Sequence, residues 1–445
     1  MRDMLACTCR GEGAVAAEAE RAVEEGVALL RGRFRRTRAH RHAADYLRGL
    51  VADVERKNGW QLAERAGYRH PRGIQRVLDR YAWDAEAVRD DLRAYVVAAL
   101  GDPRGVLVVD ETGFPKQGRH SVGVARQYCG TLGKRANCQV GVFLGYAGPT
   151  GHAGLDRALY LPREWIDDRE RARAASVPDD TAFQTKPALA LAMVERALDA
   201  GVPAAWVTAD EVYGGDSGFR APLEARGQGY VLAVRSNQPL STWPPYGAPD
   251  QWTAASFAAT IPTDAWQRLS CGEGVQGPRR YEWAYLPARP AVREGWRHGL
   301  LVRRHPERPG EVAFYLVYAP TDTALEELVR VAGARWTIDD MFKLAKGQVG
   351  LDHYEVRGWQ GWYRHITLAL LAFAALTVAA RQRGGPVLPP ARSTAPSPSP
   401  KCAASSSASS GPSRAHRPPP PQSPPGPAGG AATRRSLRTA TAVAA

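Results

Sequence analysis

Two aspartates each follow a short apolar run that is typical of a buried strand. Asp110 comes directly after Val106–Val109, and Asp210 comes directly after Trp206–Ala209. If these strands are neighbours, both carboxylates project from one sheet edge, and their mutual repulsion favours a hard divalent cation between them. Mg²⁺ or Mn²⁺ held in this way serves phosphoryl chemistry: one ion activates the nucleophile and a second stabilises the leaving oxygen. An aspartate also often ends a strand or caps a helix, so a purely structural role stays open.

The elements around the two aspartates predict a mixed α/β sheet over residues 101–239. A helix is expected at 186–200, because apolar residues recur there at helical spacing. Strands followed by a helix and another strand favour an α/β fold with a mixed sheet. Further strands are expected at 138–146, 158–161 and 230–234.

Residues 240–322 predict a β-rich insertion in this sheet. Its expected strands, at 281–285, 300–303 and 312–318, are separated by Gly- and Pro-rich turns. Five of the 12 tryptophans fall here, at Trp243, Trp252, Trp266, Trp283 and Trp296. They either form the core of a small β domain or include an aromatic that stacks on a DNA base. Helices return over residues 323–383, at 323–332, 338–346 and 362–381.

The first 100 residues predict an all-α region that binds DNA. A basic run, Arg33–Arg38, leads into a helical pattern at 43–56. Two shorter helical segments follow, and the second carries Arg72 and Arg76. This arrangement is compatible with a helix-turn-helix whose cations contact phosphates. The alternative is an ordinary helical bundle with a solvated basic face.

Charge and composition narrow the class of protein. The chain has 445 residues and a formal net charge of +14, from 59 Lys and Arg against 45 Asp and Glu. Residues 384–445 hold seven of these basic residues, no acidic residue, 14 of the 34 prolines and no aromatic residue, which predicts a disordered tail. The longest apolar stretch, 366–380, is too short for a membrane span and indicates a buried helix. The six cysteines are too scattered for a disulfide framework. We therefore expect a cytoplasmic protein with an anionic partner and no membrane association.

Five motifs together resemble the DDE transposases of bacterial insertion sequences, in the branch that has a β-strand insertion and a Tyr-Arg-Glu-Lys signature. The resemblance covers roughly residues 30–380. The motifs are Val109–Lys116, Arg126–Thr131, Asn137–Val142, Thr208–Gly214 and Gly350–Arg357.

The resemblance implies a ribonuclease-H-like core, an N-terminal DNA-binding region and two Mg²⁺ (or Mn²⁺) ions held by two Asp and one Glu. It implies cleavage at the transposon ends by metal-activated water, followed by attack of the freed 3′-hydroxyl on target DNA. The implied partners are terminal inverted repeats and target DNA, bound by a homodimer at the bacterial nucleoid.

The third catalytic position departs from the family pattern. Asp110 and Asp210 match the first two carboxylates, and Arg335 and Lys346 match the signature cations, which would contact DNA phosphates. Asp339 stands where the family has Glu, and Ala332 stands where it has Tyr. The Asp carboxylate is one methylene, roughly 1.5 Å, shorter. Asp340 could replace Asp339, and Glu355 is the next candidate.

These observations leave three hypotheses for function. The first is a Mg²⁺-dependent DNA transposase with Asp110, Asp210 and Asp339 as metal ligands. The second is a catalytically inactive remnant or DNA-binding inhibitor that still recognises transposon ends. The third is a host nuclease on the same core that cuts DNA without joining it.

Overall fold

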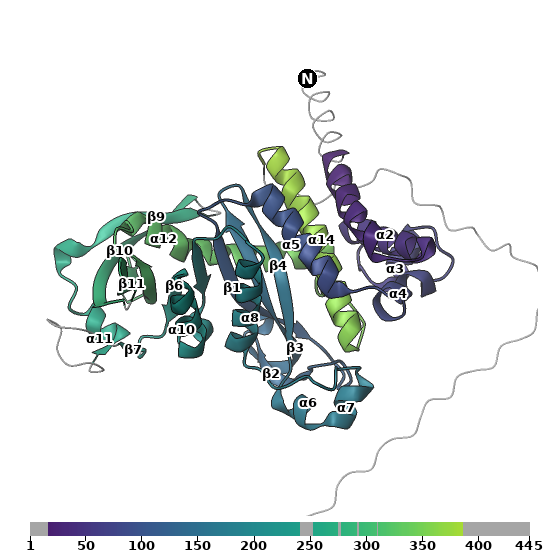
Figure 1. The fold of residues 1–445 in the computed structure, drawn as a ribbon, viewed down its shortest axis with the longest axis horizontal. Coiled ribbons are helices and arrows are strands. Elements are labelled where there is room, and N and C mark those ends of the chain that lie inside the picture. Colours follow the sequence, from purple (N-terminus) through teal and green to yellow (C-terminus); the bar gives the residue numbers. More distant parts are fainter. Residues whose placement is uncertain (1–16, 241–251, 275–276, 292, 309, 386–445) are drawn as a thin grey trace, which may run out of the picture. The chain divides into compact units, whose positions relative to one another are not determined.

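A computed structural model describes residues 17–240, 252–274, 277–291, 293–308 and 310–385. Within them ten strands form one mixed sheet flanked by helices, which confirms the predicted α/β class (Figure 1). The first nine, in spatial order, are β2 (Ala125–Cys129), β3 (Lys134–Gly148), β1 (Val106–Pro115), β5 (Trp206–Ala209), β6 (Gly229–Val234), β12 (Val312–Pro320), β11 (Trp296–Arg304), β10 (Gly277–Pro290) and β9 (Gln267–Gly274). The tenth, β4 (Gly151–Tyr160), pairs with β3.

Strand β1 is longer than its apolar run predicts. It pairs in parallel with β5 only over Val106–Val109, where every residue is almost completely buried. It then continues to Pro115 because its antiparallel pairing with β3 continues. The prediction that the strand ends at Asp110 was therefore wrong. Asp110 lies inside β1, at the point where the neighbouring strand β5 stops.

The predicted insertion strands are all present, and they extend the main sheet. β12 pairs antiparallel with β6, and β11, β10 and β9 follow outward. A second, two-stranded sheet contains β7 (Pro239–Leu240) and β8 (Trp252–Thr253), and the helix α11 (Ala254–Ala258) follows β8.

The described tryptophans of the insertion pack against its own residues. Trp283 has no exposed surface, and Trp296 stacks on Tyr318 with ring centroids 4.6 Å apart. Trp252 and Trp266 are half-buried against the small core beneath α11. This packing favours the structural interpretation for these four residues. Trp243 lies outside the described residues.

The described part of the first 100 residues contains helices and no strand. These are a helical segment at 17–30, η1 (Arg31–Arg33), α2 (Thr37–Val51), α3 (Gly59–Arg65), α4 (Arg72–Asp79) and α5 (Ala85–Leu100). Helix α4 buries Ile74, Val77 and Leu78 and leaves Arg72 and Arg76 exposed. Asn58 caps α3 by accepting hydrogen bonds from two backbone amides of its first turn.

Helix α14 (Trp359–Gln382) joins the N-terminal helices to the sheet. It is long and apolar enough to cross a membrane, but 94% of its apolar window is buried inside the protein, which confirms the expected buried helix. It packs against α2, α4, α5 and β4, and Figure 1 shows α5 alongside it. Apart from Gly384 and Gly385, the predicted disordered tail lies outside the described residues.

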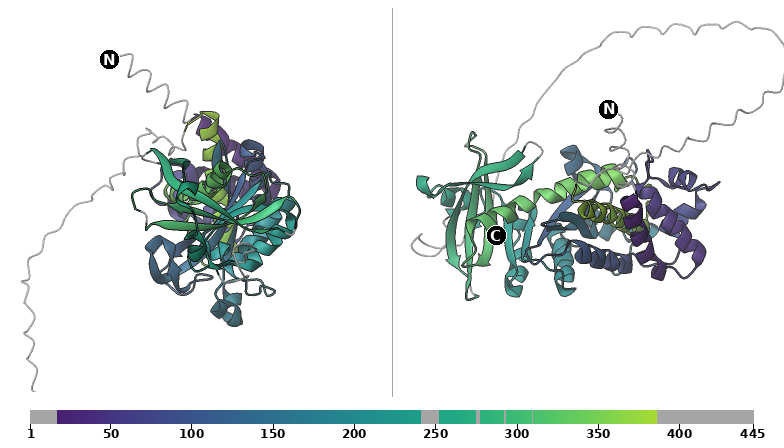
Figure 2. Two further views of the ribbon diagram at one scale, coloured as in Figure 1. Left: turned by 90° about the vertical axis from the view of Figure 1, so that its left-hand side faces the viewer. Right: turned by 90° about the horizontal axis from the view of Figure 1, so that it is seen from above.

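Two consecutive helices carry the third candidate carboxylate to the sheet. α12 (Leu325–Ala334) packs on β9, β5 and β6, and α13 (Trp336–Val349) packs on β1, β4 and α14. Arg335, which joins them, has helical backbone angles. The right-hand view of Figure 2 shows these green helices running from the insertion strands toward α14. Between β4 and β5 the chain forms two short helices, α6 (Arg163–Asp167) and α7 (Arg169–Ala174), and then the longer helix α8 (Lys186–Asp199).

Candidate active site

Sheet register brings Asp110 and Asp210 to the same level. Val109 pairs with Ala209 in the parallel β1–β5 ladder, so the next residue of each strand is an aspartate. Asp210 also caps the short helix α9 (Glu211–Gly214), because its carboxylate accepts a hydrogen bond from the backbone amide of Val212 at 2.9 Å. The side chain of Asp110 is only 13% exposed. The Asp110 and Asp210 carboxylates therefore lie on neighbouring chain segments at the level where β5 ends and β1 continues.

Both carboxyl groups have a raised pKa. Burial, and then the neighbouring Asp210, raise the pKa of Asp110 to about 8. Burial, and then the nearby Glu111, raise the pKa of Asp210. Burial and a neighbouring carboxylate thus both disfavour the charged form of each group. A positive ion placed against these oxygens would reverse that preference, and carboxylate oxygens are the donors that hard divalent cations prefer.

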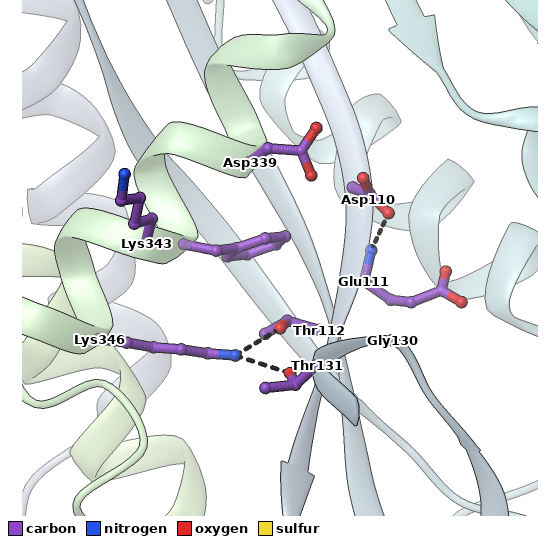
Figure 3. A pocket seen from close by; sticks show the side chains of 9 residues that line it. Asp110, Glu111, Thr112, Gly130, Thr131, Asp339, Lys343 and Lys346 are labelled. Carbon is purple, nitrogen blue, oxygen red and sulfur yellow. Dashed lines mark hydrogen bonds between the residues drawn. The ribbon is translucent and has the colours of Figure 1, made fainter. Parts of the chain in front are cut away.

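Asp339 faces the same region from helix α13. An open pocket of about 430 Å³ has Asp110, Glu111 and Thr112 on one wall and Asp339, Phe342, Lys343 and Lys346 on the other. Figure 3 shows Asp339 and Asp110 pointing into this space from facing elements. The Asp339 side chain is 54% exposed. Asp210 is not among the lining residues, so it belongs to the site through its register with Asp110.

Arg335 lies between two of the candidate carboxylates. Its Nη1 is 3.5 Å from Oδ2 of Asp110, and its Nη2 is 3.7 Å from Oδ2 of Asp339. The guanidinium thus offsets part of the negative charge that the fold concentrates there. Among the described residues, no three His, Cys, Asp or Glu side chains stand close enough together to hold a metal ion. The oxygen donors of Asp110 and Asp210 nevertheless fit a hard cation, with Asp339 across the pocket as the third.

Lys346 reaches into the pocket instead of extending into solvent. Its Nζ donates hydrogen bonds to Oγ1 of Thr112 at 2.8 Å and of Thr131 at 3.0 Å (Figure 3). Burial lowers its pKa. Lys343, one turn earlier on α13, is exposed at the same pocket. This wall therefore presents positive charge to any ligand that approaches the carboxylates.

A second set of contacts, which sequence reasoning missed, fixes the backbone around the two aspartates. The Glu111 carboxylate accepts a hydrogen bond from the buried phenol of Tyr213 on one oxygen and pairs with Lys186 on the other. These residues come from β1, α9 and α8, so one carboxylate links three elements. Glu111 and Tyr213 stand within two of the motifs that carry the family resemblance, and this position in the motifs could have identified them from the sequence. Nothing in the sequence singles out Lys186.

The two alternative third carboxylates lie away from the pocket. The Glu355 carboxylate accepts a hydrogen bond from Nδ2 of Asn58 at 3.4 Å. Asp340 is exposed, lies near His152 and does not line the pocket. Ala332, at the position of the family's Tyr, is buried in α12. Of the three candidates, Asp339 is the one that the structure brings into the pocket with Asp110.

The fold and this carboxylate site define the class of protein. The family model described as DDE superfamily endonuclease matches residues 29–284, and the chain belongs to this family. The chain is also 25% identical over 320 residues to the "Probable transposase for insertion sequence element IS701" of Microchaete diplosiphon. The matched region covers 69% of this chain and 75% of that protein. The resemblance stated from the motifs is thereby confirmed. Arg335, Asp339 and Lys346 lie beyond the residues that the family model matches.

Proposed function

We propose that the protein is a DNA transposase that cuts the ends of an insertion sequence and joins them to target DNA. The observation that carries the proposal is the parallel register that places Asp110 beside Asp210. Asp339 would complete a ribonuclease-H-like triad from the facing wall of the pocket. The family membership and the similarity to a probable insertion-sequence transposase support this function.

The three carboxylates would hold two divalent cations, Mg²⁺ or Mn²⁺. When bound, the ions would activate the attacking oxygen and stabilise the leaving oxygen of the phosphodiester. The protein's own part is to hold the carboxylates in place and to orient the DNA. Arg335 and Lys346 supply cations beside the carboxylates, where the scissile phosphate must lie.

Residues outside the pocket would bind the DNA ends. Arg72 and Arg76 are exposed on α4, as contact with phosphates requires, and residues 1–100 form the proposed DNA-binding region. Transposition joins two ends at once, so we expect a homodimer in the DNA complex. Because the proposed substrate is chromosomal DNA, we expect the protein in the bacterial cytoplasm at the nucleoid.

A catalytically inactive end-binding protein is the second candidate. Asp339 is shorter than the family's Glu, and Arg335 lies between it and Asp110. Incubation of the intact protein with a duplex of the element's terminal inverted repeat and Mg²⁺ separates the candidates. Cleavage followed by joining to a plasmid supports the transposase. Cleavage without joining indicates a host nuclease, and binding without cleavage indicates the inactive protein.

A further inference from the structure

The hairpin between β2 and β3 forms one edge of the carboxylate pocket. Gly130 and Thr131, at its tip, line the pocket (Figure 3). Thr131 is fixed there because its Oγ1 donates a hydrogen bond to the carbonyl of Gly113 at 2.9 Å and accepts one from Lys346 at 3.0 Å. The position of the hairpin relative to the carboxylates is therefore set by side-chain contacts on both walls.

Tyr128 stands two residues before Gly130 and exposes 60% of its surface. An extended chain advances about 3.3 Å per residue, so its Cα lies roughly 7 Å from the pocket edge. This is about the distance between successive phosphates of an extended DNA strand. Leu132, on the other side of the tip, is 45% exposed. A single exposed apolar residue is ordinary on a protein surface, but two beside a carboxylate pocket form a local apolar surface.

Cations surround this aromatic side chain. Arg135 is the register partner of Tyr128 in the β2–β3 ladder, and Arg126, two residues before Tyr128, is exposed on the same strand. Directly paired residues of an antiparallel ladder point to the same face, so Arg126, Tyr128 and Arg135 share one face. Within the described part of the chain, no ion pair involves Arg126 or Arg135, and Arg135 donates a hydrogen bond through Nη2 to the carbonyl of Arg126 at 3.4 Å. Their charge is available to an anionic ligand.

We propose that Tyr128 stacks on an unpaired base of the DNA strand whose phosphate enters the carboxylate pocket, while Arg126 and Arg135 contact the flanking phosphates. An aromatic ring binds the face of any free base, whereas a paired base inside a duplex has both faces covered. The described tryptophans of the insertion pack within that domain. Among the described residues, Tyr128 is the exposed aromatic residue nearest in sequence to a residue of the pocket. The inference rests on the proposed function for the identity of the ligand.

The test measures DNA binding in EDTA, so that it does not depend on cleavage. The intact protein is titrated with two probes: a fully paired 20-base-pair duplex, and the same duplex with a four-nucleotide single-stranded extension that carries 2-aminopurine next to the junction. Tyr128→Ala should weaken binding of the extended probe by roughly 5- to 100-fold, as the loss of a stacked base predicts. Binding of the paired probe should change less than twofold. Tyr128→Phe, which keeps the ring, should bind like the parent protein and quench the 2-aminopurine fluorescence equally.

Two further variants test the charges. Arg135→Ala should weaken both probes and reduce the salt dependence of binding, because it removes a phosphate contact. Arg104→Ala is the matched control, since Arg104 is also an exposed arginine but precedes the opposite end of β1. Thermal melting verifies that each variant is folded.

Equal binding of the extended probe by Tyr128→Ala and the parent would overturn the inference, as would equal losses on both probes. Failure of the proposed cleavage activity would leave this binding result unchanged.

Discussion

Val109 of β1 and Ala209 of β5 are partners in a parallel ladder, and each is followed directly by an aspartate. The paired residues are 100 positions apart in the chain, so the proximity of Asp110 and Asp210 is a product of the fold. β5 ends there and α9 begins, while β1 continues along β3. Asp110 lines the pocket that α13 faces, and Asp210 stands beside it at the level where β5 ends.

Lengthening the third carboxylate should increase cleavage. Asp339→Glu restores the methylene that the family pattern has, and we expect about a tenfold or greater increase in rate, which corresponds to ~1.4 kcal/mol at the transition state. The free energy of unfolding should change little, because the side chain is 54% exposed. Single-turnover cleavage of a terminal-repeat duplex measures the effect. The control is Asp340→Ala, whose side chain does not line the pocket. Unchanged cleavage after Asp339→Ala would show that another residue supplies the third ligand.

The Tyr213 hydroxyl should matter for metal binding as well as for stability. Tyr213→Phe removes the donor to the Glu111 carboxylate. Because the backbone amide of Glu111 donates to Oδ1 of Asp110 at 2.7 Å, the loss should disturb a proposed metal ligand. We expect the Mg²⁺ concentration for half-maximal cleavage to rise by about 10- to 100-fold, the size of effect known for contacts that orient metal ligands. Its matched control is Tyr230→Phe, which removes a buried hydroxyl that donates to the Glu224 carboxylate at 2.6 Å, away from the pocket. Both variants should lose about 1–3 kcal/mol of stability. An unchanged Mg²⁺ requirement in Tyr213→Phe would limit Glu111 to a structural role.

His365 should make stability depend on pH below neutrality. Burial lowers its pKa to about 4, and it contacts the Tyr46 hydroxyl and the Gly350 carbonyl. In the unfolded chain this histidine binds a proton near pH 6.5, whereas in the folded protein it stays neutral until about pH 4. The free energy of unfolding is therefore unaffected by His365 above pH 6.5 and decreases as the pH falls from 6.5 toward 4. Urea unfolding of the parent and of His365→Gln between pH 4.5 and 7.5 measures the slopes. The variant should show the shallower slope, and equal slopes would contradict the assignment.

The α4 arginines should contribute to DNA affinity through phosphate contacts. For each contact that Arg72→Ala or Arg76→Ala removes, the slope of log affinity against log salt concentration should become shallower by about 0.9. Thermal stability should stay unchanged, because both side chains are exposed while α4 is held by Ile74 and its buried neighbours. Fluorescence anisotropy of the intact protein with a terminal-repeat duplex gives the slopes. A slope that neither variant alters would remove α4 from the DNA interface.

Most strands, and the proximity of Asp110 and Asp210, could be predicted from the sequence because the signals are local. An apolar run of four residues followed by Asp identifies a candidate in each strand, and the helical pattern predicted α8 and α14 nearly to their ends. The end of β1 was predicted wrongly because the pairing with β3 that prolongs it comes from residues far along the chain. Edge strand β2 was missed because its exposed and half-buried residues give no apolar run.

The contacts around the site could not be predicted, because they depend on how distant elements pack. Lys186 reaches Glu111 only because α8 packs on β3 and β4, next to β1 in the sheet. Arg335 meets Asp110 only because α12 and α13 join at that point. The expected cationic role of Lys346 stays a prediction, although its hydrogen bonds to Thr112 and Thr131 place it at the pocket. Spacing along a helix indicates which residues share a face, but not what lies opposite them.

The most direct test of the central claim is cleavage by Asp110→Asn and Asp210→Asn. Each variant and the parent, or Asp339→Glu if the parent cuts too slowly to measure, is incubated with a labelled terminal-repeat duplex in Mg²⁺. End binding is measured in parallel. Each substitution should reduce cleavage to the background rate, because it removes a charged oxygen donor, while binding stays intact since DNA affinity comes from Lys and Arg elsewhere. Mg²⁺-dependent cleavage that persists in either variant would contradict the assignment of this aspartate pair as the catalytic centre.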